Sequence, residues 1–132
     1  MQILRLILIT HVLIIVLTAC NPNPPSVINY ADVPREGDVA QGEILFTSGK
    51  NSAPPCILCH IPESPASPDL AGFAERADSQ VEGQSAHEYA FYSITEPAQF
   101  IAEGYGNAMY NQYDEIFTPQ EIADLIAYLL TL

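Results

Sequence analysis

The run Cys56-Ile57-Leu58-Cys59-His60 is the most informative part of this sequence. Two thiols three positions apart, followed directly by an imidazole, have the C-x-x-C-H spacing of a covalent haem attachment site. Each thiol can add across one haem vinyl group, and the adjacent imidazole is then carried over the iron as the proximal ligand. The sequence therefore predicts one covalently bound haem c, held by Cys56, Cys59 and His60.

Three other uses of this run are less favourable. A thioredoxin-like C-x-x-C needs a βαβ frame, and no such frame is visible in the sequence. A structural zinc site needs four ligands, but after the motif the chain offers only His87 as a further Cys or His. A disulfide between Cys56 and Cys59 is compatible with an exported chain, yet it leaves His60 without a role.

The second axial ligand of the iron is predicted to be Met109. It is the only methionine left once Met1 is removed, and it ends the run Gly104-Tyr105-Gly106-Asn107-Ala108-Met109, whose glycines favour a loop that can pass close to a planar cofactor. A lone methionine otherwise commonly fills a gap in a core. The rival ligand is His87, but it lies in the S-x-x-E capping box that starts at Ser85, where a surface side chain is usual.

Before the motif, the chain begins with an export signal. Residues 3–17 are almost entirely apolar, and Arg5 is the only charge before Asp32. The run then ends in Leu17-Thr18-Ala19-Cys20, which resembles the lipobox of bacterial lipoproteins. We therefore expect residues 1–19 to be a signal peptide and Cys20 to be acylated, because an uncleaved anchor of 15 residues would fall short of the roughly 20 needed to span a bilayer.

Residues 20–36 are expected to form a proline-rich tether between the lipid and a domain at residues 37–132. The run Asn21-Pro22-Asn23-Pro24-Pro25-Ser26, with Pro34 after it, is too weakly apolar to fold alone. At about 3 Å per residue, some 15 such residues would hold the domain within roughly 45 Å of the membrane.

The patterning of the domain is helical. Thr118-Pro119-Gln120-Glu121 combines an N-cap, a first-turn proline and a capping-box glutamate, and an apolar stripe at helical spacing follows it. A middle helix is expected from Ser85 until Glu96-Pro97 ends it. Since no stretch alternates with the period of a strand, the sequence predicts an all-α fold with three main helices and long loops around haem.

Residues 37–132 resemble the class I monohaem cytochrome c domains. The segment 38–46 is similar to the family's first helix, in which a glycine and an aromatic residue, here Gly42 and Phe46, meet the last helix near Tyr128. Ser67-Pro68-Asp69-Leu70-Ala71-Gly72 is similar to the family's G-P-x-L-x-G segment, with Ser67 in place of glycine. The resemblance implies that the Pro68 carbonyl accepts a hydrogen bond from the proximal His60.

The sequence departs from the family pattern in two further ways. Tyr110 follows Met109 where proline is common, and the chain contains no Trp. Because some relatives bind a haem propionate with an indole, the resemblance requires another donor here, and Arg76 is a candidate. The alternative is that Arg76 is a solvated helix charge.

The charge excludes some functions and suggests others. The chain has 4 Lys+Arg against 16 Asp+Glu, a net charge of −12, which argues against nucleic-acid binding. Removing residues 1–19 removes Arg5 and no acid, so the mature chain carries −13. Such a surface is expected to attract redox partners with basic docking patches.

These features together predict a lipid-anchored electron carrier in the periplasm or on the outer face of the cell membrane. It would pass single electrons and would not be an enzyme, because His/Met ligation leaves the iron no open position. One alternative is a fixed subunit of a larger respiratory or photosynthetic complex. A less favoured alternative is a haem enzyme or gas-binding protein whose Met109 ligand can be displaced.

Overall fold

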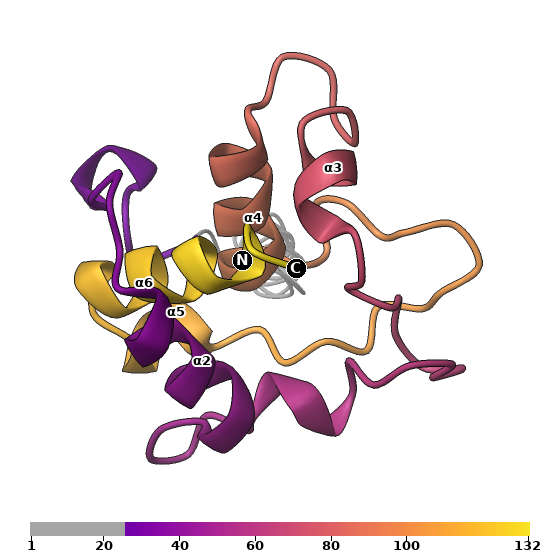
Figure 1. Cartoon of the computed structure of the whole chain (residues 1–132), viewed down its shortest axis with the longest axis horizontal. Coiled ribbons are helices and arrows are strands. Elements are labelled where there is room, and N and C mark those ends of the chain that lie inside the picture. Colours follow the sequence, from indigo (N-terminus) through magenta and orange to yellow (C-terminus); the bar gives the residue numbers. More distant parts are fainter. Residues whose placement is uncertain (1–25) are drawn as a thin grey trace, which may run out of the picture.

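The computed structural model describes residues 26–132, and the regular secondary structure in that range is helical (Figure 1). Within it no residue belongs to a β-strand, and the only extended pairing is an isolated bridge between Lys50 and Ala53. The elements in chain order are η1 (Tyr30–Asp32), α2 (Val39–Ser48), η2 (Cys56–Leu58), α3 (Phe73–Ala77), α4 (Ala86–Thr95), α5 (Tyr113–Ile116) and α6 (Pro119–Leu129). The all-α prediction is confirmed, and α2, α4 and α6 are the three main helices.

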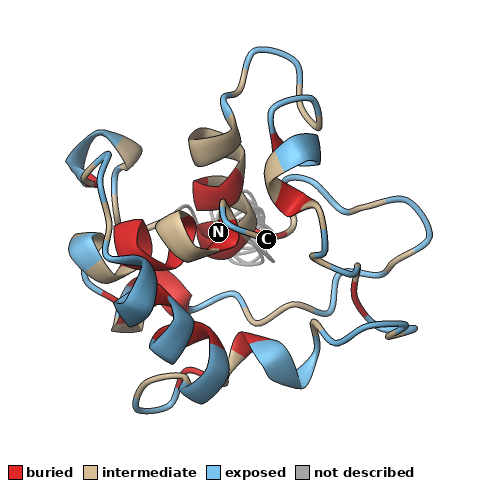
Figure 2. Cartoon of the chain, in the orientation of Figure 1, coloured by how far each residue is buried: buried red, intermediate tan, exposed pale blue. Residues whose placement is uncertain are grey.

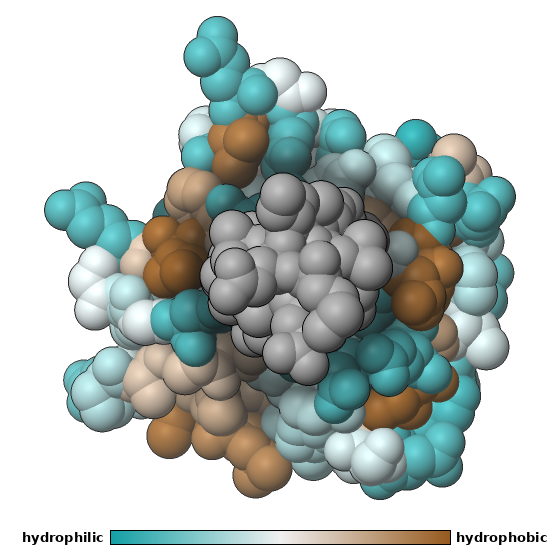
Figure 3. Space-filling view, turned by 180° about the vertical axis from the view of Figure 1, so that it is seen from behind, coloured by the Kyte–Doolittle hydropathy of each residue, from teal (hydrophilic) through white to brown (hydrophobic). Residues whose placement is uncertain are grey.

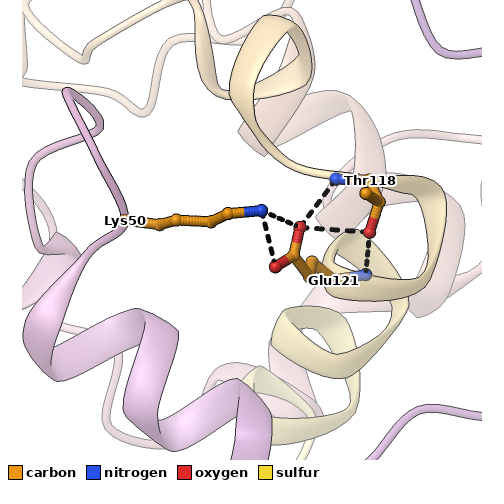
Figure 4. Close-up of polar contacts among 3 residues, drawn as sticks. All are labelled: Lys50, Thr118 and Glu121. Atoms are coloured by element: carbon orange, nitrogen blue, oxygen red, sulfur yellow. Dashed lines mark hydrogen bonds and ion pairs between the residues drawn. The ribbon is translucent and has the colours of Figure 1, made fainter.

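Side-chain caps fix where these three helices begin. Asp38 accepts hydrogen bonds from the backbone at the start of α2, and the Ser85 hydroxyl accepts one from the backbone N–H of Glu88 at the start of α4. At α6 the capping box is complete, because Thr118 and Glu121 each accept a hydrogen bond from the other's backbone N–H (Figure 4). The starts predicted at Ser85 and Thr118 are therefore confirmed.

The crossing of α2 over α6 depends on a glycine. A β-carbon built on Gly42 would lie 2.0 Å from the carbonyl oxygen of Asp124, so a larger residue cannot occupy this position without moving a helix. One turn later, the rings of Phe46 and Tyr128 meet with centroids 5.3 Å apart. The predicted contact between the first and last helices is confirmed. At Gly42 the backbones of α2 and α6 approach so closely that no side chain fits between them.

The core is built mainly on α6. Its apolar stripe points inward, and Ile122, Leu125 and Ile126 are almost completely buried, as is Phe91 of α4. Figure 2 shows the buried residues gathered along α6 and on the inner side of α4, with the outer turns of α2 exposed. The loops after η2 and after α4 extend away from this core (Figure 1), and together with it they surround the site described below.

Residues 26–33 pack against the helices, although the sequence places them in the tether of residues 20–36. Val33 is buried, with 4% of its surface exposed, and the Tyr30 ring lies 5.2 Å from that of Phe91. The backbone N–H of Val27 donates to the carboxylate of Asp114 at 2.7 Å. The reason is local: this part of the segment carries Tyr30 and Val33, which can cover apolar surface on α4, whereas the prolines precede and follow it.

The expected signal peptide, its cleavage position and Cys20 all lie outside the described residues. None of the helices in residues 26–132 is both long enough and apolar enough to cross a membrane.

Candidate haem site

A cavity of about 420 Å³ lies between the core and the long loops. Three segments form most of its wall: residues 54–60 around η2, residues 66–73 leading into α3, and residues 97–110 between α4 and α5. Apolar side chains from the helices complete it: Phe46, Ile94, Leu125 and Leu129. The space is therefore bounded by secondary structure on one side and by loops on the other, and it suits a large apolar group.

The two cysteines of the motif both line this cavity, and both are free thiols. Cys56 begins η2 and is buried, whereas Cys59 follows the same turn and is exposed. Burial raises the pKa of the Cys56 thiol to about 11, so this thiol is protonated at neutral pH. The single turn of η2 places two unpaired thiols at one wall of the cavity, as thioether formation requires.

His60 follows Cys59 directly, and a hydrogen bond to Pro68 fixes its ring. Its Nδ1 is 3.0 Å from the carbonyl oxygen of Pro68, which can only accept, so Nδ1 carries the proton and donates it. This tautomer leaves the lone pair on Nε2 free to bind a metal. His60 and Pro68 both line the cavity, and the contact that the family resemblance implies for Pro68 is present.

The structure separates the two candidates for the second axial ligand. Met109 is half-buried and lines the cavity from the loop between α4 and α5. His87 is not among the lining residues; it lies under the Tyr30 ring, with ring centroids 5.7 Å apart. Burial, followed by the charge of Arg35, lowers the pKa of His87. Of the two candidates, only Met109 lines the cavity that also contains His60.

Comparison with known proteins agrees with this arrangement. The family model described as Cytochrome c matches residues 39–132, which is most of the chain. The chain belongs to the cytochrome c family. Neither a search of curated proteins nor a search of solved structures returned a match. Domains of this cytochrome c family typically lie outside the cytoplasm and carry electrons on haem.

The family's cofactor is covalent haem c, and the residues of this cytochrome c fit it. Three observations support the fit: the wall contains two unpaired thiols, an imidazole with a free Nε2, and a lining that is otherwise mostly apolar. A small domain also gains stability from such a group, because the porphyrin adds apolar core that a short chain lacks.

The position of Arg76 does not show the contact with a haem propionate that was suggested for it. The residue is exposed and does not line the cavity of this cytochrome c. Its guanidinium donates to the carbonyl oxygen of Asp69 at 3.0 Å and also to that of Ala71. It thus braces the loop that follows Pro68, and its contact with a haem propionate stays a prediction.

Tyrosines form a part of the cavity wall that sequence reasoning missed. Tyr89, Tyr105, Tyr110 and Tyr113 all line it. The hydroxyl of Tyr113 donates to the carbonyl oxygen of Pro54 at 3.0 Å, and its ring packs edge-on to that of Tyr110 at 4.9 Å. Burial raises the pKa of Tyr113 well above its ordinary value. A usable signal was present, because Tyr110 and Tyr113 closely follow Met109 in the sequence and aromatic side chains commonly line apolar ligand sites.

Proposed function

We propose that this protein is a membrane-tethered c-type cytochrome that transfers single electrons outside the cytoplasm, with His60 and Met109 as the axial ligands of its haem. One observation carries the proposal: two free thiols, the braced His60 and the sole methionine of residues 26–132 line the same cavity. When bound, haem c supplies the one-electron couple of its iron.

The chain's residues would serve electron transfer in three ways. His60 and Met109 would hold the haem iron from both sides, which would leave no place for a substrate and would raise the reduction potential. Pro68 keeps the His60 ring in one tautomer and one orientation. The apolar side chains of the cavity exclude water, so little solvent has to reorganise when the charge changes.

The tether would be short. Acylation at Cys20 is supported by Leu17-Thr18-Ala19-Cys20, and residues 26–33 are packed on the domain. Five residues lie between Cys20 and Ser26, and six fully extended Cα–Cα steps reach at most about 20 Å. The domain would therefore be kept close to the lipid surface, well inside the 45 Å that an unpacked spacer would allow.

The partners would be redox proteins with basic docking surfaces, either encountered transiently or within one membrane complex. The mature chain carries a net charge of −13 once residues 1–19 are removed. Figure 3 shows one face on which hydrophilic side chains surround separate apolar groups. Beside the cavity, Ile57, Leu58 and Ile61 are exposed, and they supply apolar contact next to the haem attachment turn. Acidic charge would steer the encounter, and these side chains would form a small interface.

Mass spectrometry of the native protein tests this proposal directly. The expected mass is that of residues 20–132 with acyl chains and one haem. Cys20→Ala should lose the acyl chains and keep the haem, and Cys56→Ala combined with Cys59→Ala should do the reverse. A native mass without haem would contradict the proposed function, and a mass with haem and no acyl chains would contradict the tether alone.

Two further measurements separate the alternatives. Detergent extraction of membranes shows whether the haem band migrates alone, as for a tethered carrier, or with a large assembly, as for a fixed subunit. Carbon monoxide added to the reduced protein should bind slowly or not at all, since Met109 occupies the position that the gas needs. Rapid binding would favour a gas-binding protein or an enzyme.

A further inference from the structure

Ser67 stands where the cytochrome c pattern has glycine, and its side chain makes contacts that glycine cannot make. The residue is buried, with 7% of its surface exposed. Its hydroxyl donates a hydrogen bond to the carbonyl oxygen of Cys59 at 2.5 Å. The hydroxyl of Ser64 lies 3.3 Å away and is the weaker neighbour. The substitution therefore adds one partly buried hydrogen bond to the haem-binding turn.

This bond runs beside the one that orients the proximal histidine. Cys59 is joined to Ser67, and the next residues along both segments, His60 and Pro68, are joined to each other. Each bond joins residues eight positions apart, so together the two bonds form a two-rung connection at the base of residues 61–66. With the Ser67 bond in place, the Pro68 carbonyl cannot move away from the imidazole without also straining the hydrogen bond between Ser67 and Cys59.

The loop itself offers little other restraint on this geometry. Most of residues 61–66 are exposed, and Glu63 adopts a left-handed backbone with φ of 60°. Its local bonds, such as Ser64 N–H to the Ile61 carbonyl at 3.2 Å, stay within the loop and do not reach Pro68. On the side that precedes Pro68, the position of its carbonyl relative to His60 thus depends on these two hydrogen bonds, whereas Arg76 restrains the residues that follow Pro68.

We propose that Ser67 is a positioning residue that holds the Pro68 carbonyl on Nδ1 of His60 and thereby lowers the reduction potential of the haem. The inference rests on the proposed function, in which His60 is the proximal ligand. A firm hydrogen bond to the Nδ1 proton makes the imidazole a more basic ligand, which stabilises the oxidised iron more than the reduced iron. Loosening that bond should favour reduction.

Ser67→Ala in the full haem-loaded protein tests this. We expect the one-electron equilibrium to shift about threefold toward the reduced form, a rise of about 28 mV given 59 mV for tenfold. The His60 Nδ1 proton, followed by nuclear magnetic resonance, should exchange with water faster. Ser67→Thr, which keeps the hydroxyl, should restore both values. Ser64→Ala, the control within the same loop, should change neither.

The proposal is overturned if Ser67→Ala leaves the potential and the proton exchange unchanged, or if Ser64→Ala alters them equally. Should Ser67→Ala fail to mature, Ser67→Gly carries the same expectations, because glycine is the residue of the family pattern. Failure of the proposed function would be seen separately, as a wild-type spectrum without histidine and methionine ligation. In that case exchange of the His60 proton still reports whether Ser67 holds Pro68.

Discussion

The Nζ atom of Lys50 lies 2.8 and 2.7 Å from the two carboxylate oxygens of Glu121, joining the loop after α2 to the first turn of α6. The same carboxylate completes the capping box with Thr118 (Figure 4). Glu121 therefore stabilises the start of the helix that carries the core and connects it to the segment leading to the haem-binding turn.

Glu121→Gln should lower stability in a pH-dependent way. Partial burial acts to raise the pKa of Glu121, but hydrogen bonds from Lys50 and Thr118 outweigh it and hold that pKa below its ordinary value. The charged form is thus favoured in the folded state, and its contribution is complete above the ordinary value of 4.5 and is lost as the pH falls through the folded value. Because the pair is partly exposed, the loss at pH 7 should be below about 1 kcal/mol.

Denaturant unfolding of the two proteins at several pH values measures this difference. The curves should differ at pH 7 and converge in acid. Glu43→Gln, on the exposed side of α2, is the control and should differ little from wild type at either pH. A Glu121→Gln deficit that persists unchanged in acid would show that the charge is not responsible.

Gly42→Ala should destabilise the protein although alanine is the better helix former. The helix propensity gain is about 1 kcal/mol. Against it, the new β-carbon would sit 2.0 Å from the Asp124 carbonyl oxygen, so α2 and α6 must separate. Overpacking of this kind costs about 1–3 kcal/mol and sometimes more, and we expect the upper end. Gln41→Ala, exposed on the same helix, should be neutral; equal stability of the two variants by thermal unfolding would refute the close crossing.

Val33→Ala should reveal that the segment before α2 belongs to the folded domain. Val33 is 4% exposed, and losing two methyl groups from such a site costs about 1–2 kcal/mol. Val27→Ala is the matched control, since Val27 is 70% exposed and its hydrogen bond to Asp114 uses the backbone. Equal unfolding free energies for the two variants would mean that residues 26–33 contribute no packing and form a free spacer.

The acidic surface should make electron transfer depend on salt and on the charge of the partner. With a cationic metal complex as oxidant, the second-order rate constant should fall as ionic strength rises, because salt screens the attraction over about 8 Å at 0.15 M. With an anionic complex of similar potential the rate should rise instead. Stopped-flow measurements of both reactions check this, and the same salt dependence for both would contradict electrostatic steering.

Of the three main helices, α4 and α6 were predictable because each carries a signal within its own sequence, whereas α2 was predicted from the family resemblance. Thr118 and Ser85 mark helix starts by capping chemistry, and Gly42 with Phe46 marks the face of α2. The helices α3 and α5 were not predicted, since they contain only 5 and 4 residues and are too short to show a period. Their positions are set by tertiary packing, as in the stacking of Phe73 on Tyr89.

The site was predictable where chemistry demands a fixed spacing and less so where the chain folds back on itself. The motif residues, Pro68 and Met109 all line one cavity, as expected from the C-x-x-C-H run and the resemblance. The arrangement of Arg76 depends on a turn at Gly72, whose φ is 68° and brings the guanidinium onto neighbouring carbonyls. The packing of residues 26–33 depends on apolar surface supplied by α4, which composition alone does not show.

The central claim, that Met109 is the iron ligand opposite His60, is tested most directly by the visible and near-infrared spectrum of the oxidised protein. Wild type and His87→Ala should both be low-spin and show the weak sulfur-to-iron charge-transfer band. Met109→Ala should lose that band and shift toward high spin, while keeping its covalent haem. The claim is contradicted if the band is missing from wild type, survives in Met109→Ala, or disappears in His87→Ala.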